Sequence, residues 1–353
     1  MLISTLQKII YSAIVTGFLI LIGGCQIGIP KARFGTLPTA TAGSAFLDPN
    51  HLGGHSYFYS PLEKNGIVYT CKTGHIDLTH LRWNADYTLY AAKRTRKALM
   101  KKRKGFSFTI VMERSKHKMT FGYPENWDDL SHDEKSKIAE EVSLHTGPYI
   151  AYNATLWHEI LTWFGVRFIG IEPEFHSSFS WEDMYSNLIG TKLAIEAMQD
   201  PNHSYSKAMT LAIDRELERL GVQSRRTAID AAKKMKGIWF KGGTPVTGNF
   251  FVKTMKKNLD IGLGDGFVTP TIVDGICEGV KPEPLAVPNL DILSKYGLTM
   301  KYEIYMSEWE KGRILKAAHQ GGKGKTVEPD KHFPAIMEFI KKEAVEKYGY
   351  IID

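Results

Sequence analysis

The sequence is poor in cysteine and has no hydrophobic run long enough to cross a bilayer. Only three cysteines occur in 353 residues, which excludes a scaffold held together by many disulfides. The longest apolar run, residues 9–22, spans about fourteen residues, whereas a transmembrane helix needs roughly 20. No internal repeat is found, so a solenoid is not expected. The absences therefore favour an ordinary globular body.

The amino-terminal residues have the pattern of an export signal. Lys8 precedes the apolar run, which ends in Leu21-Ile22-Gly23-Gly24-Cys25. This ending resembles the lipobox of bacterial lipoproteins, in which small residues admit the peptidase and the cysteine thiol accepts a diacylglyceryl group. The resemblance implies that residues 1–24 are a signal peptide and that lipid, palmitate included, on Cys25 anchors the chain to the cell membrane. Because Gln26 follows, the resemblance implies the outer membrane in a Gram-negative host, with a periplasmic or surface-facing body.

The rest of the chain divides into a tether and a body. Residues 25–56 contain the lipidated cysteine and a stretch rich in Gly, Pro, Thr and Ala, which is typical of a flexible linker. Residues 57–353 are expected to form a single globular domain, because 43% hydrophobic and 24% charged residues are ordinary values for such a domain. A subdivision near residue 240 stays open.

The charge balance is basic and has one dense cluster. The formal net charge is +7, and loss of Lys8 with the signal leaves about +6, which favours anionic neighbours. The cluster has two interpretations: a solvated helix end whose cations suit the helix dipole, or a docking site for anionic lipid headgroups. A nucleic-acid partner is not expected for an exported protein. The cluster consists of Lys93, Arg94, Arg96, Lys97, Lys101, Lys102, Arg103 and Lys104.

Hydrophobic periodicity predicts an α+β fold that is mainly helical, with a small antiparallel β-hairpin or sheet. The Gly-rich stretch 242–288 is expected to be loop, because no strand precedes its glycines and no helix follows them as in a phosphate-binding motif. Strands are expected at 66–70, 106–113, 118–123 and 302–306. Helices are expected at about 77–100, 132–145, 148–164, 181–198, 204–220, 225–236 and 333–347.

Two neighbouring polar groups stand out in the predicted helix 148–164. His158 and Glu159 lie beside a stripe of apolar residues, on a face that they share with Thr155 and Thr162. About twenty residues later, Asp183 lies at the start of the next predicted helix. An imidazole and two carboxylates in an apolar setting are suited to acid–base or metal chemistry.

These two segments resemble the zinc helix and the second helix of the gluzincin metallopeptidases. Residues 158–162 (HEILT) resemble His-Glu-x-x-His, and residues 182–190 (EDMYSNLIG) resemble Asn-Glu-x-x-Ser-Asp. The resemblance implies zinc as the cofactor, with His158 and Asp183 as ligands and Glu159 as the base that activates water. The sequence departs from that pattern at three positions, with Thr162 in place of the second histidine, Asp183 in place of glutamate and Asn187 in place of aspartate.

A catalytic zinc needs a further protein ligand, because such sites use three protein groups and one open position. His75 and His80 are the candidates, at the expected strand-to-helix junction. Each histidine also has a structural interpretation as a hydrogen-bonded side chain. Asp183 has one too, because Ser180-x-x-Asp183 is a capping-box pattern that satisfies helix amides. The predicted function is hydrolysis of amide or ester bonds in the cell envelope.

Two alternatives remain open. Cys71 precedes His75 and His80, and a Cys-His pair of the papain-like kind would make an acyltransferase or amidase nucleophile. Cys71 is equally compatible with a buried position or with a disulfide to Cys277, and the sequence does not decide between them.

The second alternative is a non-catalytic binding or scaffold lipoprotein of the envelope. Its ligand groove would be lined by Trp157, Trp163, Phe164, Phe175, Phe179 and Trp181, although so many aromatic residues are also typical of a hydrophobic core. The lipobox together with 71–78 (CKTGHIDL), 157–165 (WHEILTWFG) and 179–190 (FSWEDMYSNLIG) resembles a family of bacterial lipoproteins known only as a domain of unknown function. That resemblance implies no activity.

Overall fold

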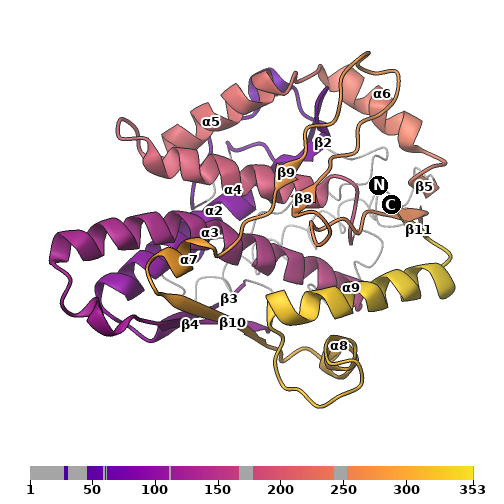
Figure 1. The fold of residues 1–353 in the computed structure, drawn as a ribbon. Coiled ribbons are helices and arrows are strands. Elements are labelled where there is room, and N and C mark those ends of the chain that lie inside the picture. Colours follow the sequence, from indigo (N-terminus) through magenta and orange to yellow (C-terminus); the bar gives the residue numbers. More distant parts are fainter. Residues whose placement is uncertain are drawn as a thin grey trace, which may run out of the picture.

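Figure 1 shows the fold of the chain as a computed structural model. It describes residues 28–30, 46–58, 60, 62–110, 113–166, 178–241 and 253–352. The predicted signal peptide, Cys25 and much of the predicted tether lie outside these residues. In the described part of the chain, no helix is both long and apolar enough to span a membrane.

Three long helices form the centre of the molecule, and α2 packs against both others (Figure 1). They are α2 (Leu78–Met100), α3 (His132–Trp163) and α4 (Asp183–Gln199). Apolar residues recur along α2 at three- and four-residue steps, which places them on the face that the other helices cover. As the periodicity predicts, these residues are buried: Leu78, Leu81, Ala85, Leu89 and Ala92.

Glycine sets the closest approach of these helices. A Cβ atom on Gly190 of α4 would lie 2.2 Å from the carbonyl oxygen of Leu81 in α2, which is far inside van der Waals contact. On α3, a Cβ atom on Gly147 would lie 2.9 Å from the Cβ of Ala92. Only residues without a side chain allow the two backbones to lie so close to α2.

The helix α3 runs without interruption through Pro148, so the prediction of two helices at 132–145 and 148–164 is wrong. A proline inside a helix removes one backbone hydrogen bond and usually bends or ends the helix. Here the segment around Pro148 is buried on α2, and this packing outweighs the local preference.

The sheet is small and antiparallel, as predicted. Its strand order is β10–β4–β3, with His117 of β4 opposite Phe108 of β3, and Met119 of β4 opposite Tyr302 of β10. Beside α2, a separate hairpin joins β1 to β2, and β2 was not predicted as a strand. The bounds are β1 (Ile67–Thr70), β2 (Gly74–Asp77), β3 (Gly105–Thr109), β4 (Lys116–Gly122) and β10 (Thr299–Tyr305).

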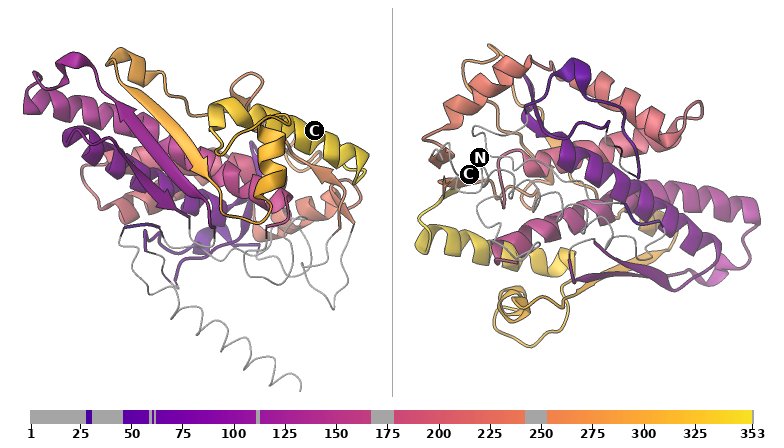
Figure 2. Two further views of the ribbon diagram at one scale, coloured as in Figure 1. Left: turned by 90° about the horizontal axis from the view of Figure 1, so that it is seen from below. Right: turned by 180° about the vertical axis from the view of Figure 1, so that it is seen from behind.

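The remaining elements surround this centre (Figure 2). The helices α5, α6 and α9 agree with prediction, whereas the short α7 and α8 were not predicted. In the described part of 242–288 the strands are only two residues long, so the loop prediction holds there. The helices are α5 (Tyr205–Arg219), α6 (Arg225–Met235), α7 (Ile292–Lys295), α8 (Lys311–Ala318) and α9 (Pro329–Glu346), with 3-10 turns at Pro49–His51 and Glu125–Trp127. The short strands are β5 (Phe240–Lys241), β6 (Lys253–Thr254), β7 (Lys256–Lys257), β8 (Phe267–Val268), β9 (Leu285–Ala286) and β11 (Ile351–Ile352).

The aromatic residues belong to the hydrophobic core. The largest buried cluster draws on residues from Leu52 to Tyr350, and the Trp157 ring stacks on Phe333 at a centroid distance of 6.2 Å. The described aromatics of the groove alternative are all buried, at 3% exposure or less, and Phe175 lies outside the described residues. Their burial supports the core interpretation, since aromatic side chains contribute much of the apolar area that drives folding. These buried residues are Trp157, Trp163, Phe164, Phe179 and Trp181.

Candidate functional site: a buried histidine among carboxylates

The site begins where β2 meets α2, because Asp77 ends the strand and caps the helix. Its Oδ1 accepts the amide hydrogen of Thr79 at 2.7 Å, as an N-cap carboxylate does. Its Oδ2 lies 2.9 Å from Nδ1 of His80, one turn into the helix. Its own amide donates to Oγ of Ser186 on α4 at 2.9 Å. The cap therefore fixes the carboxylate against the imidazole.

Asp183, in the first turn of α4, reaches the same imidazole. Its Oδ2 accepts the amide hydrogen of Ser180 at 3.1 Å, but the predicted capping box is wrong, because the N-cap of α4 is Glu182 and no side chain caps the helix. Its Oδ1 lies 3.5 Å from Nδ1 of His80 and has no hydrogen-bond partner among the described residues, although it is buried. One oxygen of this carboxylate is held by the Ser180 amide, and the other faces the histidine.

Glu159 approaches the opposite ring nitrogen from α3. Its Oε1 lies 3.8 Å from Nε2 of His80, and its Oε2 accepts the amide hydrogen of Phe179 at 2.8 Å. Phe179 has a φ of 54°, a left-handed backbone conformation that is uncommon outside glycine. The imidazole is thus placed between carboxylates from the end of β2, from α3 and from α4, with 18% of its side chain exposed.

Burial and the neighbouring charges shift the pKa values in this cluster. Burial opposes the charge on His80, but Asp183 and Asp77, together with Glu159, outweigh it and raise the pKa of His80 to about 10. Burial, and then the negative charge of Asp183, raise the pKa of Glu159 to about 7. Burial likewise raises the pKa of Asp183, and that of the neighbouring Glu182 well above its usual range.

Lys257 supplies a second buried cation and was missed by the sequence analysis. It lies on β7, which pairs in parallel with β11, and its Nζ donates to the carbonyl oxygen of Ser178 at 2.6 Å. Burial lowers its pKa to about 7, against the opposing effect of Glu159 and Asp183. A lone lysine in a loop-like stretch carries no motif, so no sequence signal pointed to it.

The residues around His80 fit a divalent metal. One ligand atom from each of Asp77, His80 and Asp183 can be chosen so that all three lie within 4.8 Å of one another. Around an ion with ligand bonds near 2.1 Å, tetrahedral donors are about 3.4 Å apart. The two distances from Nδ1 of His80, at 2.9 and 3.5 Å, lie on either side of that value. The buried, unpartnered Oδ1 of Asp183 is the atom that an ion would satisfy.

His158, the predicted first zinc ligand, is not part of this cluster. Its Nδ1 lies 3.0 Å from Oε1 of Glu113, and its ring meets Trp83 edge-on at 5.4 Å between centroids. Consecutive residues on a helix point about 100° apart, so His158 and Glu159 have different surroundings. The structure places His80 within ion-pair distance of Asp183, so the ligand set proposed below differs from the one that the gluzincin resemblance implies.

His75 also lies elsewhere, in an aromatic pocket. Nε1 of Trp181 donates to Nδ1 of His75 at 3.3 Å, and Nε2 of His75 contacts the carbonyl oxygen of Ala228 at 3.2 Å. Both ring nitrogens are thus occupied by hydrogen bonds. Of the two histidines proposed to complete the site, His80 is the one that the structure brings to Asp183.

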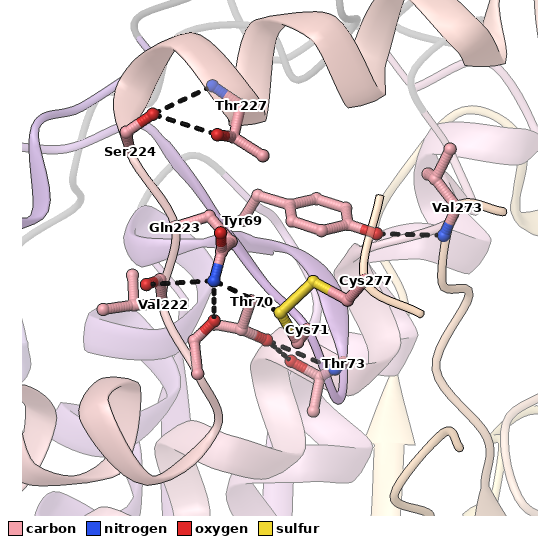
Figure 3. The surroundings of a disulfide bond; sticks show 11 residues. Tyr69, Thr70, Cys71, Thr73, Val222, Gln223, Ser224, Thr227, Val273 and Cys277 are labelled. Atoms are coloured by element: carbon pink, nitrogen blue, oxygen red, sulfur yellow. Dashed lines mark hydrogen bonds between the residues drawn. A yellow bond between two sulfur atoms is a disulfide. The ribbon is translucent and has the colours of Figure 1, made fainter. Parts of the chain in front are cut away.

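Cys71 is joined to Cys277 in a disulfide, shown in Figure 3, with sulfur atoms 1.98 Å apart. The amide of Gln223 points at the Cys71 sulfur from 3.2 Å, and that residue also bonds the carbonyl oxygen of Gly221. A nucleophile needs a free thiolate, which a disulfide does not provide. The structure therefore resolves the open pairing and does not support the Cys71 nucleophile.

The fold and the site define a mainly helical α+β protein with a partly buried histidine among buried carboxylates. A family model described as "Protein of unknown function (DUF4056)" matches residues 44–265, and the chain belongs to this family. The match includes Asp77, His80, Glu159, Asp183 and Lys257, whereas β10, α8 and α9 lie beyond it. No curated protein and no solved structure matches the chain.

Proposed function

We propose that this chain is a lipid-anchored envelope protein that holds a divalent metal, zinc in the first instance, at Asp77, His80 and Asp183. The proposed activity is hydrolysis of amide or ester bonds in an envelope substrate. The observation that carries the proposal is the buried Oδ1 of Asp183, which faces His80 without a hydrogen-bond partner among the described residues. One imidazole and two carboxylates are a donor set that zinc accepts, with a fourth position left for substrate or water.

The residues around the ligands have suitable chemistry for hydrolysis. A divalent metal would supply a Lewis acid that polarises a carbonyl group and lowers the pKa of water. Glu159 would supply the proton acceptor at Oε1, which lies 3.8 Å from Nε2 of His80 and so beside the proposed ligands. Lys257 interacts electrostatically with Glu159 and Asp183, so in its protonated form it favours negative charge in the site.

Export and anchoring are supported by different residues. The lipobox at Cys25 carries the anchoring proposal, and it lies outside the described residues. The disulfide between Cys71 and Cys277 agrees with an oxidising compartment, since disulfides persist outside the cytoplasm and are rare within it.

The proposed metal site is tested by measuring bound metal. The purified chain is depleted with a chelator, dialysed against zinc and analysed by elemental mass spectrometry and calorimetric titration. We expect one zinc per chain in the wild type, and loss of most of that binding in His80→Ala. Asp183→Asn removes one charged ligand and is expected to weaken binding at least about 10-fold, because ligating and supporting groups contribute on that scale.

His158→Ala is the matched control, since it removes the histidine of the resembling motif but none of the proposed ligands. It is expected to keep one zinc. Glu159→Gln is expected to keep the metal while losing turnover of chromogenic amide and ester substrates. A wild type that binds no zinc would show that His80 is only an internal ion-pair partner, and metal loss confined to His158→Ala would refute the ligand set.

A further inference from the structure

A tryptophan is held in solvent at the start of α8. Trp309 is 88% exposed, the highest value among the described large hydrophobic residues. The preceding residue, Glu308, is buried, and its Oε1 accepts hydrogen bonds from Oγ of Ser115 at 2.7 Å and from the amide of Arg114 at 3.0 Å. These hydrogen bonds fix the backbone at Glu308 to the segment before β4, so the residue next to Trp309 is held in place.

Exposed lysines follow the tryptophan. Between positions 309 and 326 the sequence contains one acidic residue, Glu310. Its one arginine, Arg313, already pairs with Glu343 of α9 at 3.0 Å. None of the four lysines forms an ion pair with another described residue, so their charges are available to a partner. These lysines are Lys311, Lys316, Lys323 and Lys325, and all are exposed.

The position of α8 leaves this surface open. The helix lies at the edge of the molecule, beyond α9 and away from the α2–α3–α4 centre (Figures 1 and 2). Its apolar residues Ile314, Ala317 and Ala318 are buried, and the helix packs on α9. The core contact therefore uses one side of α8, and the exposed lysines stay in solvent.

We propose that Trp309 and the four lysines, here named the α8 surface, dock onto a membrane that contains anionic lipid. Tryptophan prefers the headgroup level of a bilayer, where its ring meets apolar chains and its N–H stays hydrated. Lysines near an anionic bilayer each strengthen binding about fivefold. An exposed tryptophan next to an anchored residue, followed in sequence by four exposed lysines that form no ion pair among the described residues, matches both components of such a surface. This proposal goes beyond hydrolysis and does not depend on the metal.

The basic cluster at the end of α2 fits a membrane less well. Arg96 lies 2.7 Å from Glu140, and Lys102 donates to Asp128, so acidic residues of the following segment neutralise part of the cluster. Its cations also lack an exposed tryptophan: Trp127, in the nearby turn, is buried. The α2 cluster therefore serves as an internal control for a purely electrostatic effect.

The test is vesicle binding. The chain is prepared without residues 1–24, none of which lies in the described structure, and with Cys25→Ser, so that no lipid is attached. Sedimentation is measured with vesicles of phosphatidylcholine alone and of phosphatidylcholine mixed with phosphatidylglycerol. We expect binding to the mixed vesicles only, about 30-fold weaker binding in Lys311→Gln/Lys316→Gln, and several-fold weaker binding in Trp309→Ala. The blue shift of tryptophan emission on binding should disappear in Trp309→Ala.

Lys97→Gln/Lys101→Gln, at the end of α2, is the matched control and removes the same charge from a different surface. It is expected to lower binding less than threefold. Equal binding of the wild type to both kinds of vesicle, no binding to either, or equal losses in the two double variants would overturn the proposal. Circular dichroism of each variant confirms that the exchanged residues, all exposed, leave the fold intact.

Discussion

At the scale of single residues, two histidines five positions apart have opposite electrostatic surroundings. Burial among aromatic rings lowers the pKa of His75 to about 4, although the hydrogen bond to the Ala228 carbonyl acts in the opposite direction. The pKa of His80 is raised to about 10, because carboxylates from Asp77 and Asp183 face its ring. Identity and spacing in the sequence do not distinguish these cases, since the partners come from distant segments.

The neutral state of His75 predicts a pH dependence of folding. Its pKa falls from about 6.5 when unfolded to about 4 when folded, so its contribution to stability is full above pH 6.5 and lost as the pH falls toward 4. The loss amounts to at most about 3 kcal/mol. In His75→Phe, the free energy of unfolding should lack this part of its dependence on pH. At pH 7 this variant should be less stable by about 1–3 kcal/mol, because Trp181 and the Ala228 carbonyl lose their partner.

Urea unfolding at three pH values between 4 and 7 measures this slope. His145→Phe exchanges an exposed histidine and serves as the control, with a slope expected to match the wild type. A slope in His75→Phe as steep as in the wild type would mean that other groups cause the acid sensitivity.

At the scale of elements, capped and strongly periodic helices were predictable from sequence. The N-cap at Asp77 places the start of α2 correctly, and the serines at 204 and 224 cap α5 and α6. Local rules failed where packing decides the outcome, as at Pro148 in α3. They also failed for α8, a helix too short for its periodicity to be distinctive.

The site was predictable only in part, for the same reason. The motifs identified Glu159 and Asp183, and His80 was one of two candidates. Asp77 belongs to the candidate site because the first turn of α2 brings residues three apart together, so that its second oxygen faces His80. No sequence pattern pointed to Lys257, because its strand β7 is positioned by pairing with β11 at the far end of the chain.

The contact between α2 and α4 gives a prediction about an element. Gly190→Ala places a methyl group against the Leu81 carbonyl, so α4 must move away from α2. We expect destabilisation of about 1–3 kcal/mol or more. We also expect weaker zinc binding, because Asp183 and His80 lie in the first turns of these two helices.

Gly312→Ala is the control for this substitution, since Gly312 lies in α8 with nothing within 4 Å of the position that the new methyl group would take. It should raise stability by up to about 1 kcal/mol, because alanine favours the helix more than glycine does. Differential scanning calorimetry measures both variants. A Gly190→Ala protein as stable as the wild type would show that the helix spacing adapts freely.

At the scale of the whole molecule, distant segments are joined at several places. Residues on both sides of position 240 contribute to one buried cluster, and β7 pairs with β11 near the carboxyl terminus. The disulfide adds a covalent link between the end of β1 and the loop that contains Cys277, across a sequence separation of 206 residues. Closing such a long loop lowers the conformational entropy of the unfolded chain, so the disulfide is expected to contribute about 2–5 kcal/mol to the free energy of unfolding.

The proposed export would link this contribution to the compartment of the chain, because disulfides form in oxidising compartments and are rare in the cytoplasm. Chain made with residues 1–24 should incorporate labelled palmitate, and the label should be lost in Cys25→Ser. In this chain, Cys71 should resist thiol alkylation until the disulfide is reduced.

Chain made without residues 1–24 should be alkylated at Cys71 without prior reduction. It should also unfold at a lower urea concentration, at the same midpoint as the Cys71→Ser/Cys277→Ser variant. If both preparations are reduced in cells, or if palmitate stays on Cys25→Ser, then anchoring and export do not proceed as proposed. Equal midpoints with and without the bond would instead mean that the buried cluster alone holds the two parts of the chain together.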